Sequence, residues 1–108
     1  MGQNMNDPKF EMVSKWYKFY FYEDYFECYW KSGFIKKNRT VYYKDITDIE
    51  CSVVTINFVP CYTYKFSIVG QKNLELGANY RKQLENLVPA IEYIKECRAN
   101  VILRSANI

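Results

Sequence analysis

The amino-acid sequence predicts an α+β domain in which antiparallel strands are followed and closed off by one C-terminal amphipathic helix. Aromatic residues make up 19% of the 108 residues, and flat rings pack well on the pleated surface of a sheet. From about residue 15 to residue 76, apolar residues recur with a period of two, as in half-buried strands. After Gly77 the period changes to 3.6, which indicates a helix. A chain of this length holds one hydrophobic core, so we expect a single domain.

Six segments carry the signal of a strand. The first, residues 16–22, is aromatic on both faces, and the other five alternate. The side chains expected to face the core are Phe26, Cys28 and Trp30; Val41 and Tyr43; Ile49, Cys51 and Val53; Tyr64, Phe66 and Ile68; and Leu74 and Leu76. A lysine-rich loop is expected over Phe34–Asn38. Pro60 cannot donate to a sheet ladder, so Asn57–Cys61 is expected to be a connection or an edge.

The C-terminal helix is predicted from an N-cap at Asn79. Its apolar stripe runs through Leu84, Leu87, Val88, Ile91, Ile94 and Cys97. Pro89 lies inside this stripe and either kinks the helix or splits it in two. We expect a flexible segment over residues 1–14, the domain over 15–99 and a tail over 100–108. Val101–Ile108 either extends the helix or frays.

This order of elements resembles that of the bacterial PH-like domains, a group that includes YcxB-like modules. The residues that carry the resemblance are Phe21–Phe26, Val41–Ile49, Tyr64–Ile68 and the helix from Tyr80. The resemblance implies a partly open antiparallel β-barrel of six to seven strands capped by the helix. A seventh strand would then lie in Phe10–Ser14 or around Ile56–Val59. The helix has no Trp, unlike that of eukaryotic PH domains, which argues against a close relation to their phosphoinositide-binding branch.

Charge and cysteine content narrow the classes of function. A net charge of +3 is too small for a nucleic-acid-binding protein, which needs a strongly basic face. The chain has four cysteines without CxxC spacing and no histidine, so we expect no metal site and no cofactor. Cys28, Cys51 and Cys97 fall on predicted apolar faces, and buried reduced thiols are typical of the cytoplasm. No apolar run approaches the ~20 residues of a membrane span.

Nothing in the sequence favours catalysis. No GxSxG, P-loop or GxGxxG motif occurs, and the commonest general base, histidine, is missing. Glu23-Asp24 belongs to a predicted turn, where acidic residues are common. If the protein were an enzyme, Asp45, Asp48 and Glu50 would be the carboxylates of its site. This enzyme hypothesis stands third, after the two binding hypotheses described below. We therefore expect a protein that is not an enzyme and has no small-molecule substrate.

The most specific functional feature is basic. Four cationic residues, Lys31, Lys36, Lys37 and Arg39, flank the apolar pair Phe34 and Ile35. Their spacing resembles the signature with which lipid-binding PH domains hold phosphorylated head groups. Cations beside apolar side chains suit a peripheral anionic membrane surface. The alternative is that the lysines are ordinary solvated loop residues and that Phe34 or Ile35 packs down as a lid.

The second functional feature is an excess of tyrosine. The eleven tyrosines cannot all be interior in so small a domain, and exposed Tyr is favourable at protein interfaces. The candidates are Tyr17, Tyr20, Tyr22, Tyr29, Tyr42 and Tyr62. An open barrel also leaves an edge strand to which a second copy or a peptide can pair. We therefore predict an interaction module that contacts a protein or itself, with the anionic membrane as the alternative partner.

Overall fold

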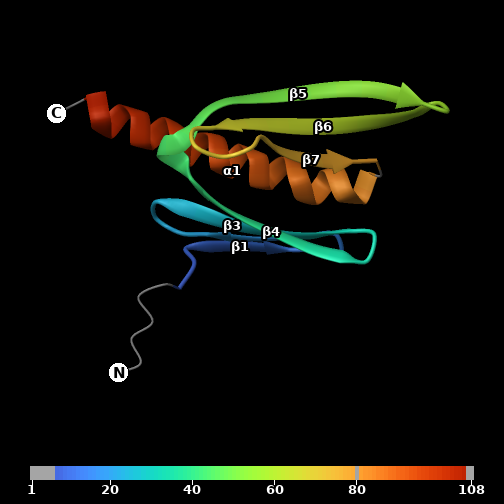
Figure 1. The fold of residues 1–108 in the computed structure, drawn as a ribbon, viewed down its shortest axis with the longest axis horizontal. Helices are drawn as coiled ribbons and strands as arrows, with labels where there is room; N and C mark the ends of the chain where they lie inside the picture. The colour runs from blue at the N-terminus through green and yellow to red at the C-terminus, as the bar shows by residue number, and fades with distance from the viewer. Residues whose placement is uncertain (1–6, 80, 107–108) are drawn as a thin grey trace.

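The computed structural model describes residues 7–79 and 81–106, with side chains as far as Arg104. Seven strands are followed by one long helix (Figure 1). The elements are β1 (Phe10–Val13), β2 (Tyr17–Phe21), β3 (Tyr25–Ser32), β4 (Ile35–Tyr42), the short 3-10 helix η1 (Tyr43–Asp45), β5 (Ile46–Ile56), β6 (Val59–Ile68), β7 (Leu74–Ala78) and α1 (Arg81–Ala106).

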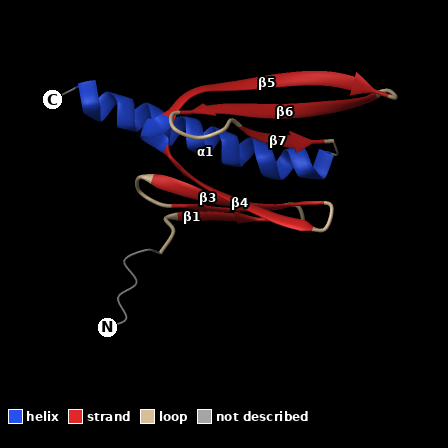
Figure 2. Ribbon diagram, viewed as in Figure 1, coloured by secondary structure: helices blue, strands red, loops and turns tan. Residues whose placement is uncertain are grey.

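The strands form two antiparallel sheets. The first has the order β1-β2-β3-β4 and the second has the order β5-β6-β7. The chain passes from one sheet to the other through η1, and α1 runs along the molecule beside both layers (Figures 1 and 2). The predicted α+β class, with antiparallel strands capped by one C-terminal helix, is confirmed, and the topology is consistent with a PH-like arrangement.

The hydrophobic core lies between the two sheets and the helix. Phe19 and Phe21 of β2 and Phe26 of β3 are buried, with neighbouring rings about 6 Å apart. The second sheet contributes Phe66, Ile68, Leu74, Leu76 and Ala78, and α1 contributes Leu87, Ala90, Ile91 and Ile94. Burial of this many apolar side chains is the main driving force for folding. The need to bury these side chains explains why the apolar residues of α1 form one continuous stripe along the helix.

Hydrogen bonds join the layers around this core. The Tyr17 hydroxyl donates to the Gly77 carbonyl at 2.8 Å and accepts from the Gly77 amide at 3.1 Å. Arg98 of α1 donates to the carbonyl oxygens of Ile46 and Thr47 at 3.0 and 2.9 Å. Arg39 of β4 donates to the Lys72 carbonyl at 2.9 Å. These bonds tie the first sheet to the second and the second sheet to the helix.

Two element boundaries differ from the sequence-based expectation. Phe10–Val13, placed in the flexible segment 1–14, forms β1 and pairs with β2, so the seventh strand is the first of the two options. Residues 1–6 lie outside the described part of the chain. The helix continues to Ala106, so the option that Val101 onward extends the helix holds as far as Ala106, and residues 100–106 are not a separate tail. Pro89 does not split the helix, and residues 107–108 lie outside the described part of the chain.

The lysine-rich loop is much shorter than predicted. Ser32 pairs with Ile35, so only Gly33 and Phe34 connect β3 to β4, and Lys36 and Lys37 belong to β4. Gly33 has a φ of +66°, which a glycine adopts without the steric cost that a Cβ brings. A two-residue turn therefore closes this hairpin.

The distal half of the β5–β6 hairpin, residues 51–64, is here called the finger, and its outer part, from Val54 to Cys61, projects beyond β7 (Figure 1). β7 pairs with β6 only as far as Tyr62. Cys51 and Val53, expected in the core, are exposed, with Val53 55% accessible. Their alternation is that of a strand, but no described element covers their face at this end.

Candidate functional site

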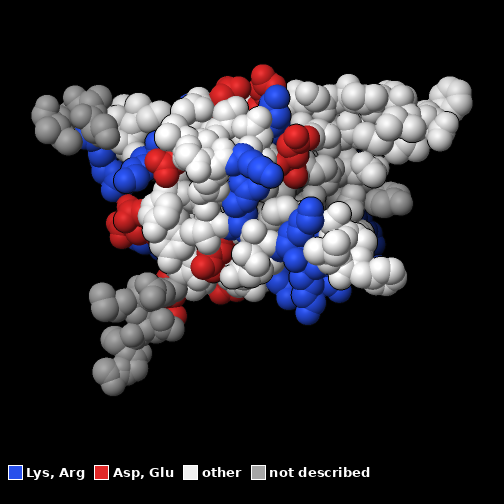
Figure 3. All heavy atoms as spheres, in the orientation of Figure 1, with Lys and Arg blue, Asp and Glu red and all other residues white. Residues whose placement is uncertain are grey.

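A hollow of about 670 Å³ opens on the first sheet between the β1–β2 turn and the β3–β4 hairpin. Five lysines and no carboxylate line it: Lys15, Lys18, Lys31, Lys36 and Lys37. All five side chains are exposed. In Figure 3 the Lys and Arg side chains gather over this region, at the lower right of the view. We call this site the lysine hollow.

The strand register sets like charges against each other in the hollow. Lys31 of β3 and Lys36 of β4 are direct cross-strand partners next to the turn. Like charges in such positions destabilise a sheet. Among the residues that the structure describes, none of the five lysines forms an ion pair. The repulsion is therefore uncompensated within the protein, and a bound anion would relieve it.

Aromatic side chains form the rest of the lining. Trp16 and Trp30 are half-buried, and the rings of Tyr20 and Tyr29 meet edge to face with centroids 5.8 Å apart. Ser14 organises the β1–β2 turn, since its hydroxyl accepts from the amides of Trp16 and Tyr17. Aromatic rings therefore share the lining of the hollow with the five lysines.

The predicted basic cluster is brought together only in part. Lys31, Lys36 and Lys37 share the hollow, whereas Arg39 is absent from its lining and bonds Lys72 and Gln71 of the β6–β7 loop. Phe34 is fully exposed at the tip of the β3–β4 hairpin, and Ile35 is 65% accessible. Neither packs down as a lid.

The finger ends in a second exposed phenylalanine. Ile56 pairs with Val59, and the two turn residues, Asn57 and Phe58, have φ values of 54° and 66°. This is the geometry of a type I′ turn, in which glycine usually follows asparagine. Phe58 is 99% accessible, and a bulky side chain at positive φ costs about 1–3 kcal/mol. An exposed ring held at that cost in place of glycine points to a role for the ring itself.

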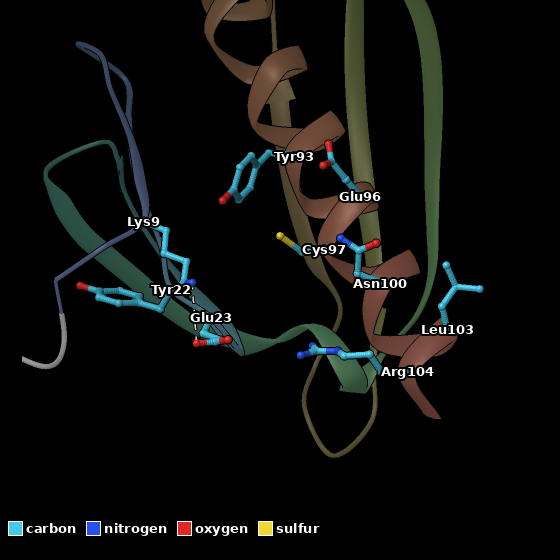
Figure 4. Close-up of a pocket in the computed structure, with 9 residues that line it drawn as sticks. All are labelled: Lys9, Tyr22, Glu23, Tyr93, Glu96, Cys97, Asn100, Leu103 and Arg104. Carbon is cyan, nitrogen blue, oxygen red and sulfur yellow. Dashed lines mark ion pairs between the residues drawn. The ribbon is translucent and has the colours of Figure 1, made fainter. Parts of the chain in front are cut away.

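A separate cavity of about 480 Å³ lies between the β2–β3 turn and the C-terminal half of α1 (Figure 4). On its β2–β3 side, Lys9 forms an ion pair of 3.7 Å with Glu23. On its helix side, Cys97 points toward the cavity (Figure 4). Burial raises the pKa of the Cys97 thiol, so it stays protonated at neutral pH. A protonated thiol is a poor nucleophile.

The tyrosine candidates divide among three places: four of them, Tyr20, Tyr22, Tyr29 and Tyr42, lie on the outer face of the first sheet, and the other two lie in the core and on the finger. Tyr17 is buried and bonded to Gly77, so it is a core residue and is removed from the predicted interface set. Tyr20 and Tyr29 border the lysine hollow. Tyr22 and Tyr42 both contact Tyr25 near the β2–β3 turn. Tyr62 lies half-buried on the finger.

The carboxylates considered for an enzyme site do not converge on a metal position. Within residues 7–79 and 81–106, no group of three or more His, Cys, Asp and Glu side chains is arranged to hold an ion. In the same part of the chain, no helix is long and apolar enough to cross a membrane.

Sequence reasoning missed four residues of these sites. Lys15, Lys18 and Trp16 enter the hollow because the β1–β2 turn lies beside the β3–β4 hairpin. That neighbourhood depends on long-range strand pairing, which a local pattern does not reveal. Phe58 had a visible signal, because it follows Asn57 in a stretch that carries no charge from Cys51 to Tyr64.

No protein-family model matches the chain, and neither the curated proteins nor the solved structures include a match. The resemblance to PH-like domains therefore depends on the order and pairing of the strands and on the terminal helix.

Proposed function

We propose that the protein is a non-catalytic, PH-like domain that binds the surface of an anionic membrane through the lysine hollow. The observation that carries the proposal is the set of five lysines without a carboxylate, including the opposed pair Lys31 and Lys36. Each cation held near an anionic surface contributes about 1 kcal/mol of attraction. Phe34 and Ile35, exposed at the adjoining tip, supply an apolar contact with the interfacial region.

The test is co-sedimentation with phosphatidylcholine vesicles that contain or lack phosphatidylserine. We expect binding only to the anionic vesicles, and weaker binding at high salt, because the Debye length falls from ~10 Å at 0.1 M to ~3 Å at 1 M. Replacing Lys31, Lys36 and Lys37 by Gln should weaken partitioning on the order of 100-fold, at about 1 kcal/mol per lysine.

The matched control replaces Lys44, Lys72 and Lys95 by Gln. These three lysines are exposed and lie outside the hollow, so the control has the same net charge as the test variant. It should keep most of the binding. Equal losses in both variants would mean that only net charge matters, and no binding by the unmodified protein would refute the proposal.

A second candidate, contact with another copy of the chain, is supported by the outer edge of β5. β5 is the terminal strand of its sheet in the described structure, and its distal residues Cys51–Ile56 are exposed and uncharged. Such an edge is a template for pairing with a further strand. Analytical ultracentrifugation tests this candidate: Val54→Lys should convert a dimer to a monomer. A wild-type monomer at all accessible concentrations would rule this candidate out.

A further inference from the structure

The two hairpin tips point to the same end of the molecule. Both the β3–β4 turn and the β5–β6 turn lie at the right in Figure 1. Each turn carries a phenylalanine that is fully exposed, Phe34 at 103% and Phe58 at 99%. Each phenylalanine is followed by an exposed β-branched residue, Ile35 and Val59. The lysine hollow adjoins the first tip, so this end combines two apolar tips with a cationic surface.

The finger has the composition of a segment that enters an apolar medium. It carries no charged residue between Cys51 and Tyr64, and the projecting end at the upper right of Figure 3 shows neither blue nor red. Val53 and Val54 are each more than half exposed although they lie on opposite faces. A flat protein surface would cover one of these faces, whereas the interior of a lipid headgroup layer covers both faces and the tip.

The backbone at the tip is suited to partial dehydration. Ile56 and Val59 are paired across the turn, which satisfies polar groups that would be costly to bury alone. The next residue of β6 is Pro60, which has no backbone N–H to desolvate. Shallow insertion of the tip therefore leaves few polar groups without a partner.

We propose that the finger is a second membrane anchor, which inserts Phe58, with Ile56 and Val59, into the interfacial region of the anionic bilayer that the lysine hollow attracts. This inference rests on the proposed function and adds an apolar contact on the other sheet. The lysines attract the surface through a screened, long-range interaction, and the finger contributes an attraction that salt does not weaken.

The experiment compares three variants with the wild type in the same vesicle assay, at low and high salt. Phe58→Gly removes the ring and relieves the positive φ, so we expect roughly tenfold weaker binding together with an unchanged or higher thermal midpoint. Phe58→Lys adds a positive charge at the tip and should also bind more weakly. Val69→Ser changes an exposed apolar residue just after the opposite end of β6 and should bind as the wild type does.

The outcomes separate the two proposals. If the wild type binds and both Phe58 variants bind as tightly as the wild type, the finger is not an anchor. The proposal that the lysine hollow binds the membrane then still stands. Tighter binding by Phe58→Lys would show that only charge matters and would overturn the inference. A lipid-free dimer that Phe58→Gly converts to a monomer would make the finger a self-association surface instead. Absence of binding by the wild type refutes the proposed function itself.

Discussion

Tyr43 illustrates, at the scale of one residue, how a polar group is accommodated in this core. Its ring is fully buried, and its hydroxyl donates to the carbonyl oxygen of Tyr22 at 3.1 Å. Burial raises the pKa of Tyr43, and the neighbouring Cys97, Tyr93 and Asp24 add to the increase. In the folded state the phenol therefore stays neutral at pH values well above the pH at which a free tyrosine ionises.

We predict that the free energy of unfolding decreases in the alkaline range and that Tyr43 contributes to the decrease. In the unfolded chain Tyr43 loses its proton near pH ~10, whereas the folded state keeps it, so folding is progressively disfavoured as the pH rises. The slope contributed by one such group is about 1.4 kcal/mol per pH unit. Below pH ~10 the contribution is constant, because both states hold the proton.

Urea unfolding from about pH 8 to about pH 11 measures this slope. Tyr43→Phe should cost about 1 kcal/mol at neutral pH through the lost hydrogen bond and should show a shallower alkaline decline. Tyr42→Phe, on an exposed ring, serves as the control and should keep the wild-type slope. An equally steep decline in Tyr43→Phe would contradict the assignment.

At the scale of the elements, α1 is a single helix despite an internal proline. Pro89 lies on the exposed side, and the buried residues Leu87, Ala90 and Ile91 surround it in sequence. Proline has no N–H for the carbonyl of Glu85, and its ring clashes with that turn. The apolar stripe on either side of Pro89 stays in phase, so packing against the strands holds together a helix whose own backbone is weakened there.

We predict that Pro89→Ala stabilises the protein by about 1–2 kcal/mol. The gain comes from the restored backbone hydrogen bond and the higher helix propensity, and is partly offset by the greater freedom of alanine in the unfolded chain. The midpoints of urea unfolding measure this gain in stability. Glu96→Ala, at an exposed position on the same helix, is the control, and its free energy of unfolding should stay within about 0.5 kcal/mol of the wild type. An unchanged or lower midpoint in Pro89→Ala would mean that the helix is shaped around the proline.

Particular elements show what local pattern predicts and what it does not. Alternation correctly placed Phe26, Cys28 and Val41 in the core, because period two is a property of the strand itself. It failed for Cys51 and Val53 because the pattern defines a face and not what covers that face. β1 was ambiguous, since four residues are too few for a periodicity to be distinct. The same limit applies to the candidate site. Local pattern finds Lys31, Lys36 and Lys37, which are close in sequence, but not Lys15 and Lys18, which join them only through tertiary pairing.

At the scale of the whole molecule, the two sheets are joined covalently only through η1. On the far side from this link, Tyr17 connects β2 to Gly77 of β7 through two hydrogen bonds. Arg98 fastens α1 to the beginning of β5. The Tyr17 bonds act directly between the sheets, whereas the Arg98 bonds act between the helix and the second sheet. We therefore infer that Tyr17 helps to determine how the lysine hollow on one sheet lies with respect to the finger on the other.

We predict that Tyr17→Phe lowers the free energy of unfolding by about 1–3 kcal/mol, because it leaves both the amide and the carbonyl of Gly77 without their partner. The ring stays, so the loss reflects hydrogen bonding rather than packing. Amide exchange of β7 should accelerate more than that of Leu87–Ile94 in α1, since the bonds act between the sheets. If Tyr17 also sets the relative position of the two hairpin tips, the variant should bind anionic vesicles more weakly than Arg98→Met, which removes two hydrogen bonds between the helix and the second sheet. Equal binding by these two variants would show that the hollow and the finger act without a fixed geometry between them.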